Sequence, residues 1–338
     1  MVYIENDVKD AAFHFSAEEY IMREYPLNQP VLTLWQTEKC VMLGNYQVAE
    51  AEIDMGVARK ESVQIVRRPS GGGTIYTDLG TFLITIIMPA SGEEDSQQIA
   101  KENISDLLVG ALGQIGIPAE IQGRNDITVA NKKITGVAQY SKFGKICSHG
   151  SLLYDADLEM LTRILRVDDE KIRSKAIKSV RSRVTNIKEH METPCSTQEF
   201  FEQFKKALLM EIKSRNEIKV STHKFSQDEF DKINKIREEK YANPSWTIGR
   251  SPKFSLHNSK RFTGGKVEVY LDVDKGMLTS CSIRGDFLGV VPIRGLEAHF
   301  ENSEFQYQVF CKLLDNISLN PFLGSITKDE LLSCFFDC

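Results

Sequence analysis

The chain has 338 residues, of which 41% are hydrophobic and 26% charged, a balance typical of a globular protein with one large or two ordinary domains. Its formal net charge of −5 argues against a protein built to bind nucleic acid. No charge-free stretch is long enough for a membrane helix, no signal peptide is visible, and the seven scattered cysteines lack zinc or redox spacing. We therefore expect a cytoplasmic protein with reduced thiols.

The N-terminal segments predict a helix, two short strands and a second helix. Residues 11–25 repeat apolar residues at helical spacing and stop at Pro26, and we expect Glu18 and Glu19 on the solvated face of this helix. The next segments are predicted as two strands joined by a polar turn and then as a polar helix: Val31–Trp35, Cys40–Leu43 and residues 50–61.

The stretch Val63–Pro89 has apolar runs on both sides of a basic, glycine-rich turn. The runs predict buried strands, the second of them over Phe82–Met88. In the turn, Gly71–Gly73 leave backbone N–H groups free of side chains, so a ligand can approach the main chain closely. Arg67 and Arg68 add fixed positive charge and forked donors. The turn matches neither a Walker A loop nor GxGxxG, and it predicts a site for a small anionic ligand.

The middle of the chain predicts a helix followed by paired strands. Ile99–Ile115 places its apolar residues on one helical face. Asp126–Ala130 and Lys133–Gln139 form a predicted strand pair, in which Gly136 marks a bulge or a close approach. Another strand, expected to break at its central Ser-His-Gly, and another helix follow: Ile146–Leu153 and residues 158–165.

The last part of the chain changes character at one boundary. Two amphipathic helices, Thr197–Ile212 and Ser226–Lys240, precede Asn243-Pro244-Ser245, the best boundary signal in the sequence. Beyond it we predict three short strands with glycine turns and a final helix: Phe254–Leu256, Gly265–Asp272, Leu278–Ile283 and about Ser303 to Leu314. Helices and hairpins are interleaved without strict βαβ order, so the predicted class is α+β, with domains at residues 1–243 and 244–338.

Four groups of residues resemble, in the same order, the motifs of one enzyme family. The first is Arg-Arg-x-Ser-Gly-Gly-Gly at residues 67–73, with Asp-Leu-Gly at 78–80. The second combines Gly-Arg-Asn-Asp at 123–126, the spacing Lys133-x-x-Gly-x-Ala, and Ser-His-Gly at 148–150. The third is Ser-Val-Arg-Ser-Arg-Val-Thr-Asn at 179–186, and the fourth runs from Trp246 to Gly276. Over nearly its whole length, the chain resembles the two-domain bacterial lipoate–protein ligase A family.

The resemblance implies a fold, an activity and partners. The fold is a large mixed-sheet catalytic domain of the biotin/lipoate ligase type with a smaller α+β accessory domain at the C-terminus. Lipoate attacks the α-phosphate of ATP, with Mg²⁺, to give lipoyl-AMP and pyrophosphate, and a lysine of an apo lipoyl domain then receives the lipoyl group. That domain belongs to a 2-oxoacid dehydrogenase acyltransferase subunit, the glycine-cleavage H protein, or both.

The same resemblance assigns site residues by their motif positions. Lys133 is the catalytic lysine, which holds the carboxylate and the α-phosphate together, and Asp126 orients either Lys133 or a bound Mg²⁺. The residues assigned to ATP or the adenylate are Arg68, Gly73, Thr74, Ile75, Tyr76, Lys133, Arg181 and Arg183. The residues assigned to lipoate are Arg68, Ser70, Gly71, Gly72, Thr77, Gly136, Ala138 and His149. For His149, a role as an ordinary hydrogen-bonded core residue is an alternative.

Two positions depart from the family pattern. Thr77 stands where members usually have the His of a His-Asp pair, and Thr81 stands where they usually have Asn. Each change leaves a hydroxyl in place of a ring or an amide. Because Lys133 and both glycine patterns are retained, we expect effects on ligand preference or affinity rather than loss of catalysis.

Two other functions compete with the ligase. An octanoyl- or lipoyltransferase of the same fold would use a cysteine thioester and no ATP, and Cys147 is the cysteine nearest the motifs. A buried strand cysteine is the plainer interpretation of Cys147. A non-catalytic lipoate-binding protein is the other alternative, suggested by Thr77 and Thr81. A biotin ligase is disfavoured because no GRGRxG-like loop is present.

A basic stretch, Ser174–Asn186, completes the set of predictions. It is poor in apolar residues, and like charges at Lys175, Lys178, Arg181 and Arg183 repel one another. We expect this stretch to be open without ligand and to cover the adenylate when lipoyl-AMP is bound, which would keep water from the anhydride.

Overall fold

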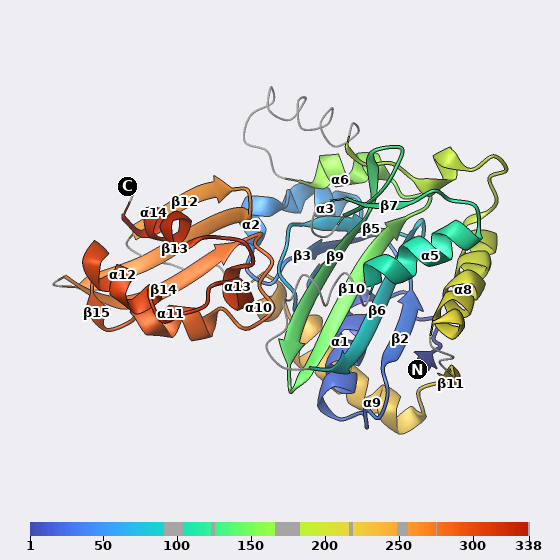
Figure 1. Ribbon diagram of the computed structural model, residues 1–338, viewed down its shortest axis with the longest axis horizontal. Helices are drawn as coiled ribbons and strands as arrows, with labels where there is room; N and C mark the ends of the chain where they lie inside the picture. Colours follow the sequence, from blue (N-terminus) through green and yellow to red (C-terminus); the bar gives the residue numbers. More distant parts are fainter. Residues whose placement is uncertain are drawn as a thin grey trace.

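The computed structural model describes residues 1–90, 104–122, 126–165, 183–215, 219–248, 256–274 and 276–336. In this part of the chain the largest element is a mixed eight-stranded sheet in the order β11-β1-β2-β6-β10-β9-β8-β7 (Figure 1). β1 is parallel to both of its neighbours, and the strand pairs from β2 to β7 are antiparallel. In sheet order, the strands are Ser221–His223, Val2–Ile4, Val31–Trp35, Thr81–Pro89, Lys145–Leu153, Lys132–Lys142, Asp126–Val129 and Glu120–Gln122.

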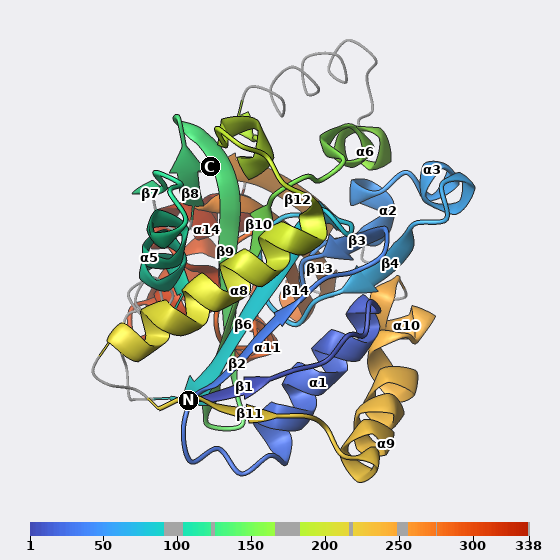
Figure 2. The same cartoon turned by 90° about the vertical axis from the view of Figure 1, so that its right-hand side faces the viewer.

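Helices cover both faces of this sheet, as Figure 2 shows. β6 explains why, because its side chains alternate between two cores. Phe82, Ile84 and Ile86 join the core beneath α5 and α8, while Leu83 and Ile87 join the core beneath α1 and α9. A strand that is covered on both faces is apolar throughout, which is what the sequence of β6 shows. The covering helices are α5 (Asp106–Gln114), α8 (Thr197–Ser214), α1 (Ala11–Arg23) and α9 (Gln227–Ile236).

A small three-stranded sheet carries the glycine-rich loop. Its order is β4-β3-β5, with β3 parallel to β4 and antiparallel to β5. The loop joins β4 to β5, so both of its ends are fixed by one sheet. The elements of this unit are β3 (Cys40–Leu43), β4 (Gln64–Arg67), β5 (Ile75–Thr77) and the helices α2 (Ala49–Glu52), α3 (Met55–Lys60) and α6 (Leu158–Ile164).

The C-terminal part forms a separate antiparallel sheet, β12-β13-β14-β15, with helices packed on it (Figure 1). Its elements are β12 (Leu256–Phe262), β13 (Gly265–Asp274), β14 (Met277–Gly285), β15 (Ser303–Glu304), α11 (Arg294–Phe300), α12 (Tyr307–Leu314), α13 (Asn320–Leu323) and α14 (Lys328–Phe336). Between α9 and this sheet lie the π-helical turn Arg237–Tyr241 and α10 (Pro244–Thr247), and a 3₁₀ turn, Ile187–His190, precedes α8.

The α+β class and most predicted elements are confirmed. The strand pair of β8 and β9 turns at Ala130 and Asn131, both in the left-handed region with φ of 50° and 60°. Of the predicted helix Ile99–Ile115, residues 99–103 lie outside the described ranges. All six cysteines of the described ranges are free. Within those ranges no helix combines the length and apolar character that crossing a membrane requires.

Glu18 and Glu19 are buried, so the prediction of a solvated face was wrong. The reason is that the Glu18 side chain faces β6 and β10 of the sheet, and the Glu19 side chain faces the π-helical turn Arg237–Tyr241. Both glutamates instead accept hydrogen bonds, Glu18 from Thr85 and Glu19 from Tyr241. A polar pattern on one helix does not reveal which distant strands and turns cover those side chains.

Several element boundaries also differ from prediction, among them β12, which covers Leu256–Phe262 where the sequence predicted Phe254–Leu256. β10 is unbroken, because its Ser-His-Gly centre is paired to strands on both sides. The helix expected over residues 50–61 is two helices, since the Asp54 carboxylate caps α3 by accepting from the N–H groups of Gly56 and Val57. The predicted last helix begins at Tyr307, not Ser303, and α13 and α14 follow it.

Candidate functional site

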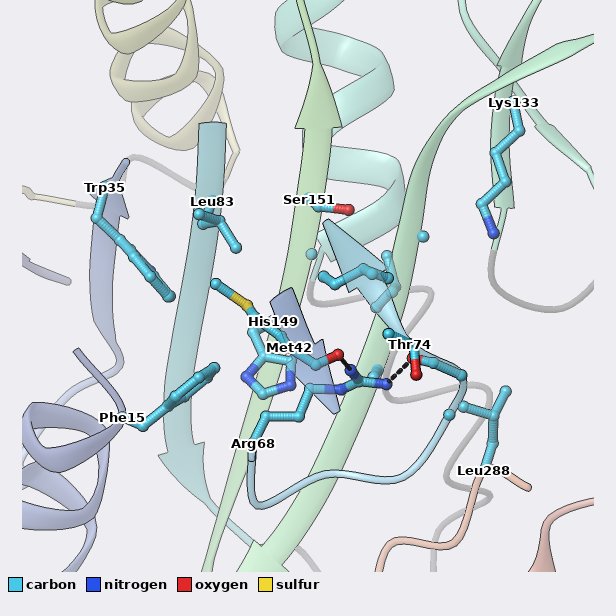
Figure 3. Close-up of a pocket in the computed structure, with 17 residues that line it drawn as sticks. Phe15, Trp35, Met42, Arg68, Thr74, Leu83, Lys133, His149, Ser151 and Leu288 are labelled. Atoms are coloured by element: carbon cyan, nitrogen blue, oxygen red, sulfur yellow. Dashed lines mark hydrogen bonds between the residues drawn. The ribbon is translucent and has the colours of Figure 1, made fainter. Parts of the chain in front are cut away.

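A cavity of about 230 Å³ lies between the glycine-rich loop and the strands β9 and β10 (Figure 3). At one end its wall is apolar and largely aromatic. At the other end the wall consists of two positively charged side chains and glycine backbone. The apolar end is lined by Phe15, Trp35, Met42 and Leu83, and the polar end by Arg68, Gly72, Gly73, Thr74 and Lys133. His149 lies between them. The cavity therefore suits a ligand with an apolar chain at one end and a negative charge at the other.

Arg68 supports the glycine-rich loop from within. Its guanidinium donates to the carbonyl oxygens of Met42 (3.0 Å), Gly71 (2.8 Å) and Gly73 (2.7 Å). Burial lowers the pKa of Arg68 from 12.5 to about 10, so it keeps its charge at neutral pH. Arg68 thus both shapes the loop and places a buried positive charge at the cavity wall.

Arg67 lies outside the cavity, and the expectation that it serves an anion was wrong. It is completely buried and donates to the carbonyl oxygens of Gly44 (2.8 Å), Gln47 (2.6 Å) and Thr247 (2.9 Å). In return, Trp246 Nε1 donates to the Arg67 carbonyl at 2.9 Å. The side chain therefore joins β4 to α10, which lies almost 180 residues later in the sequence.

Lys133 and Asp126 meet at the polar end of the cavity. Lys133 Nζ lies 2.6 Å from Asp126 Oδ1, and both side chains are about one-third exposed. The sheet brings them together because Asp126 on β8 pairs with Gly136 on β9. Lys132, in contrast, does not line the cavity. The choice of Lys133 over Lys132, made from motif spacing, thus agrees with the position of the side chain, and its catalytic role stays a prediction.

The end of the third motif lies beside Lys133. Val184 forms a parallel bridge to Lys133, and the Thr185 N–H donates to the Lys133 carbonyl at 3.0 Å. The Asn186 side chain is bonded in both directions to the backbone of Ala156. Arg183 is exposed just before this segment. Arg181, Lys175 and Lys178 lie outside the described residues, as do Gly123, Arg124 and Asn125 of the second motif.

The position of His149 is compatible with both of its predicted roles, and its role toward lipoate stays a prediction. Its ring lines the cavity, and its nitrogens are hydrogen-bonded within the protein, Nε2 to Ser70 Oγ at 2.6 Å and Nδ1 to Glu18 Oε1 at 3.3 Å. Gly136 and Ala138 also line the cavity. For Gly136, the predicted close approach is confirmed, since an added Cβ would lie 3.1 Å from Lys133 Nζ.

Several assigned residues support the cavity without lining it. Ser70, Gly71, Tyr76 and Thr77 are all absent from its wall. Thr77 is fully buried, with its hydroxyl 2.7 Å from that of Thr37, so the structure does not place it against a ligand. Tyr76 packs in the core beside α2 and α3. Ile75, like Thr74, does line the cavity.

The accessory domain contributes directly to the site. Leu288 lines the cavity, and the Gly72 N–H donates to the Phe287 carbonyl at 3.0 Å. The Phe287 ring stacks on Tyr46 with centroids 5.0 Å apart. The motifs of the C-terminal part did not predict Leu288 as a pocket residue. No local sequence signal identified four other pocket residues either: Phe15, Trp35, Met42 and Leu83. All five come from distant positions in the sequence and meet only in the folded chain.

The described ranges contain one group of three potential metal ligands whose ligand atoms all lie within 4.8 Å of one another: Glu18, Cys147 and His149. All three are buried, and burial raises the pKa of the Cys147 thiol well above 9.0, which disfavours the thiolate that a metal needs. At the polar end, Asp126 supplies one carboxylate, and its neighbour is Lys133.

Both parts of the chain match known protein families. The family model "Lipoyl protein ligase A/B catalytic domain" matches residues 10–209, and "Bacterial lipoate protein ligase C-terminus" matches residues 251–335. The predicted division at residues 243 and 244 falls between these matches and stays a prediction. Lipoate-protein ligase LplJ of Bacillus subtilis (strain 168) is 34% identical over 338 residues, which covers 99% of this chain and 100% of the relative.

Two solved structures share the fold. P. falciparum LipL1 in complex with lipoate superposes with a TM-score of 0.80 at 22% identity, covering 100% of this chain and 99% of the other. A lipoate-protein ligase A bound with ATP gives a TM-score of 0.62 at 22% identity, covering 73% of this chain and 98% of the other. The matches to both family models and to a full-length relative show that this chain belongs to the lipoate–protein ligase family.

Proposed function

We propose that this chain activates lipoate with ATP and transfers the lipoyl group to a lysine of an apo lipoyl domain. The observation that carries the proposal is a single cavity with an aromatic end and a polar end where Lys133 and Arg68 meet glycine backbone. Family membership and the lipoate- and ATP-bound structures of the same fold support this assignment. Acceptors from 2-oxoacid dehydrogenases or the glycine-cleavage H protein are part of the proposal.

In the first step, a lipoate carboxylate oxygen attacks the α-phosphorus of ATP. An acyl–phosphate anhydride forms, and pyrophosphate leaves with the electron pair of the broken P–O bond. Both reactants are anionic, so the protein must offset their repulsion and hold them in line. Lys133 is assigned to bridge the carboxylate and the α-phosphate, and the loop backbone around Gly73 and Thr74 is assigned to the nucleotide.

In the second step, the neutral amine of the acceptor lysine attacks the anhydride carbonyl. An amide forms, AMP leaves, and the amine loses a proton. The positive charge of Lys133 stabilises the developing negative charge in this step as well. Apolar walls at Phe15, Trp35 and Leu83 bury the acyl chain and place its carbonyl at the polar end.

Asp126 is assigned to orient Lys133, because its carboxylate is 2.6 Å from the ammonium group. We also propose that ATP is used together with Mg²⁺. In nucleotide sites this ion is usually held by phosphate and water oxygens with one or two carboxylates. Among the described residues, Asp126 is placed to offer such a carboxylate at this end. Bound there, the ion would offset phosphate charge.

The competing transferase needs a reactive cysteine. Cys147 is fully buried, and burial raises the pKa of its thiol well above 9.0. Such a thiol is a poor nucleophile at neutral pH. Cys147 packs in the core beneath α1, so the plainer interpretation as a buried strand cysteine fits its position.

The decisive experiment uses purified protein with lipoate and ATP before any acceptor is added. A ligase releases pyrophosphate and catalyses ATP–pyrophosphate exchange, and later adds a lipoyl group to apo acceptor domains, as mass spectrometry would show. A transferase releases no pyrophosphate. A carrier binds lipoate without exchange. Either of the last two results would overturn the proposed function.

A further inference from the structure

A buried carboxylate lies behind the apolar wall of the cavity. Glu18 is on α1, and only 3% of its surface is exposed. It packs beside Thr85 of β6 and His149 of β10, both of which are also buried. A carboxylate in such surroundings is costly unless several donors reach it, so its partners indicate its purpose.

Hydrogen bonds connect Glu18 to two rings that line the cavity. Thr85 Oγ1 donates to Glu18 Oε1 at 2.7 Å, and the same hydroxyl accepts from Trp35 Nε1 at 3.2 Å. His149 Nδ1 lies 3.3 Å from Glu18 Oε1, and His149 Nε2 lies 2.6 Å from Ser70 Oγ. Two hydrogen-bond chains therefore end on one oxygen atom, Glu18 Oε1, and the second begins at Ser70 in the glycine-rich loop.

The chemistry of the groups fixes the direction of the bonds that reach the Glu18 carboxylate. An indole N–H only donates, and a carboxylate only accepts. Thr85 must therefore accept from Trp35 and donate to Glu18. His149 Nδ1 donates to the carboxylate, and His149 Nε2 pairs with the hydroxyl of Ser70. Both hydrogen-bond chains, one from Trp35 through Thr85 and one from Ser70 through His149, end at the Glu18 carboxylate.

We propose that Glu18 is the positioning residue of the acyl pocket: through Thr85 and His149 it sets the orientation of the Trp35 and His149 rings. This inference rests on the proposed function and deepens it. Because both ring N–H groups point into the wall, the cavity is left with ring surface, which favours an apolar chain. Phe15, in edge contact with both rings, completes this surface.

Neighbouring Glu19 offers a matched control. It lies on the same helix turn and is also buried, at 7% exposed. Its carboxylate is paired with Tyr241, Lys240, Arg23 and Lys142, and none of these contacts involves Trp35 or His149. Glu18→Met and Glu19→Met each remove one buried carboxylate of similar size, so they separate loss of stability from loss of positioning.

The first measurement needs no ligand. The chain has two tryptophans, and Trp246 Nε1 donates to the Arg67 carbonyl. In protein labelled with ¹⁵N-tryptophan, Glu18→Met and Thr85→Val should move the indole resonance of Trp35 and leave that of Trp246 in place. Glu18→Gln and Thr85→Ser keep an acceptor and a hydroxyl, and should move it much less. An unmoved Trp35 resonance in both Glu18→Met and Thr85→Val would overturn the proposal.

The second measurement is lipoate and ATP binding by calorimetry. Glu18→Met should weaken lipoate binding about tenfold or more, the size expected for losing hydrogen bonds to a charged group. ATP binding should change by less than about twofold, and Glu19→Met should change neither affinity by more than about twofold. Equal weakening by Glu18→Met and Glu19→Met would overturn the positioning role. If the unmodified protein bound no lipoate, the proposed function would fall, whereas the resonance test would still report on the hydrogen-bond chains.

Should Glu18→Met not fold, Thr85→Val and Thr85→Ser still decide the matter. Thr85→Val breaks the branch to Trp35 alone and keeps the shape of the side chain. Thr85→Val should weaken lipoate binding, whereas Thr85→Ser, which keeps the hydroxyl, should retain it. Equal lipoate affinity in these two variants would contradict the proposal.

Discussion

Lys133 and Gly136 lie on the same side of β9 although they are three residues apart. In a regular strand such residues point to opposite faces. Here Ile127 pairs with Thr135 and Thr128 pairs with Lys133, so Ile134 is an extra residue, a β-bulge. The bulge lets the lysine side chain fold back over Gly136 and reach Asp126. This geometry gives a physical reason for the spacing Lys-x-x-Gly in the motif.

Lys133→Ala should abolish adenylate formation, and Lys132→Ala should have little effect. Only Lys133 lines the cavity. Losing one charged contact to a developing charge costs about 2–4 kcal/mol, or roughly 10²–10³ in rate. ATP–pyrophosphate exchange measures this step directly. If Lys132→Ala were the inactive variant instead, the assignment of the whole site would be wrong.

Gly136→Ala should impair catalysis more than stability. An added Cβ would lie 3.1 Å from Nζ and 3.3 Å from Cε of Lys133, and the end of that flexible side chain can move away. The chain then stays folded, while the ammonium group leaves its place beside Asp126. Exchange rates and thermal unfolding together test this expectation. Gly113→Ala, on α5 with no atom within 4 Å of the added Cβ, is the control and should keep full activity.

The part of the site that could be predicted is the part that is local in sequence. The turn, the glycines and Lys133 fall within short motifs, and β8 and β9 bring Asp126 to Lys133 through one hairpin. The rest depends on contacts between distant segments. Trp35 and Leu83 line one wall because β2 pairs with β6.

Burial of charge was the hardest feature to predict. Arg67 belongs to a motif that suggests an anion site, yet α10 covers it from almost 180 residues away. Glu18 belongs to a helix whose periodicity suggests a polar face, yet that face meets β6 and β10. The spacing of apolar residues in a helix sequence indicates the face that is buried by apolar contacts. It does not indicate whether the polar face is buried as well.

Stability should fall in mild acid because of His14. Burial lowers its pKa from 6.5 to about 4, and its Nε2–H donates to the Val8 carbonyl at 2.8 Å. Between those values the unfolded chain binds a proton that the folded chain does not, so the stability present above pH 6.5 is lost as the pH falls toward 4. At pH 5 this amounts to about 2 kcal/mol.

Urea unfolding at pH 7 and pH 5 tests the role of His14. In His14→Phe, which keeps an aromatic ring against Trp35, the loss between the two pH values should shrink by about that 2 kcal/mol. His299→Gln, which changes an exposed histidine of α11, should leave the loss unchanged. An unchanged loss in His14→Phe would mean that other groups cause the acid sensitivity.

Thr77→His, which restores the usual family residue, should destabilise this protein. Thr77 is fully buried, and its hydroxyl is 2.7 Å from that of Thr37. A larger ring there overpacks the core at a cost of about 1–3 kcal/mol. Thermal unfolding measures the cost, and lipoate affinity should change only through movement of the neighbouring loop. A more stable and more active variant would show that the position belongs to the binding site after all.

Gly71 and Gly73 should differ sharply in their tolerance of alanine, although they belong to the same three-glycine run. A Cβ on Gly71 would lie 2.4 Å from the Phe287 carbonyl oxygen, a backbone atom that cannot yield without moving the accessory domain. The same atom on Gly73 would find its nearest neighbour, Asp286 Cβ, at 3.9 Å, an ordinary contact. Gly71→Ala must therefore displace either the loop or the Phe287–Leu288 segment, and Leu288 is part of the cavity wall.

We expect Gly71→Ala to lower the unfolding temperature and weaken lipoate binding, and Gly73→Ala to change the unfolding temperature little. Calorimetric lipoate binding and thermal unfolding of the two variants check this directly. Equal behaviour of the two variants would show that the accessory domain does not press on the loop in solution.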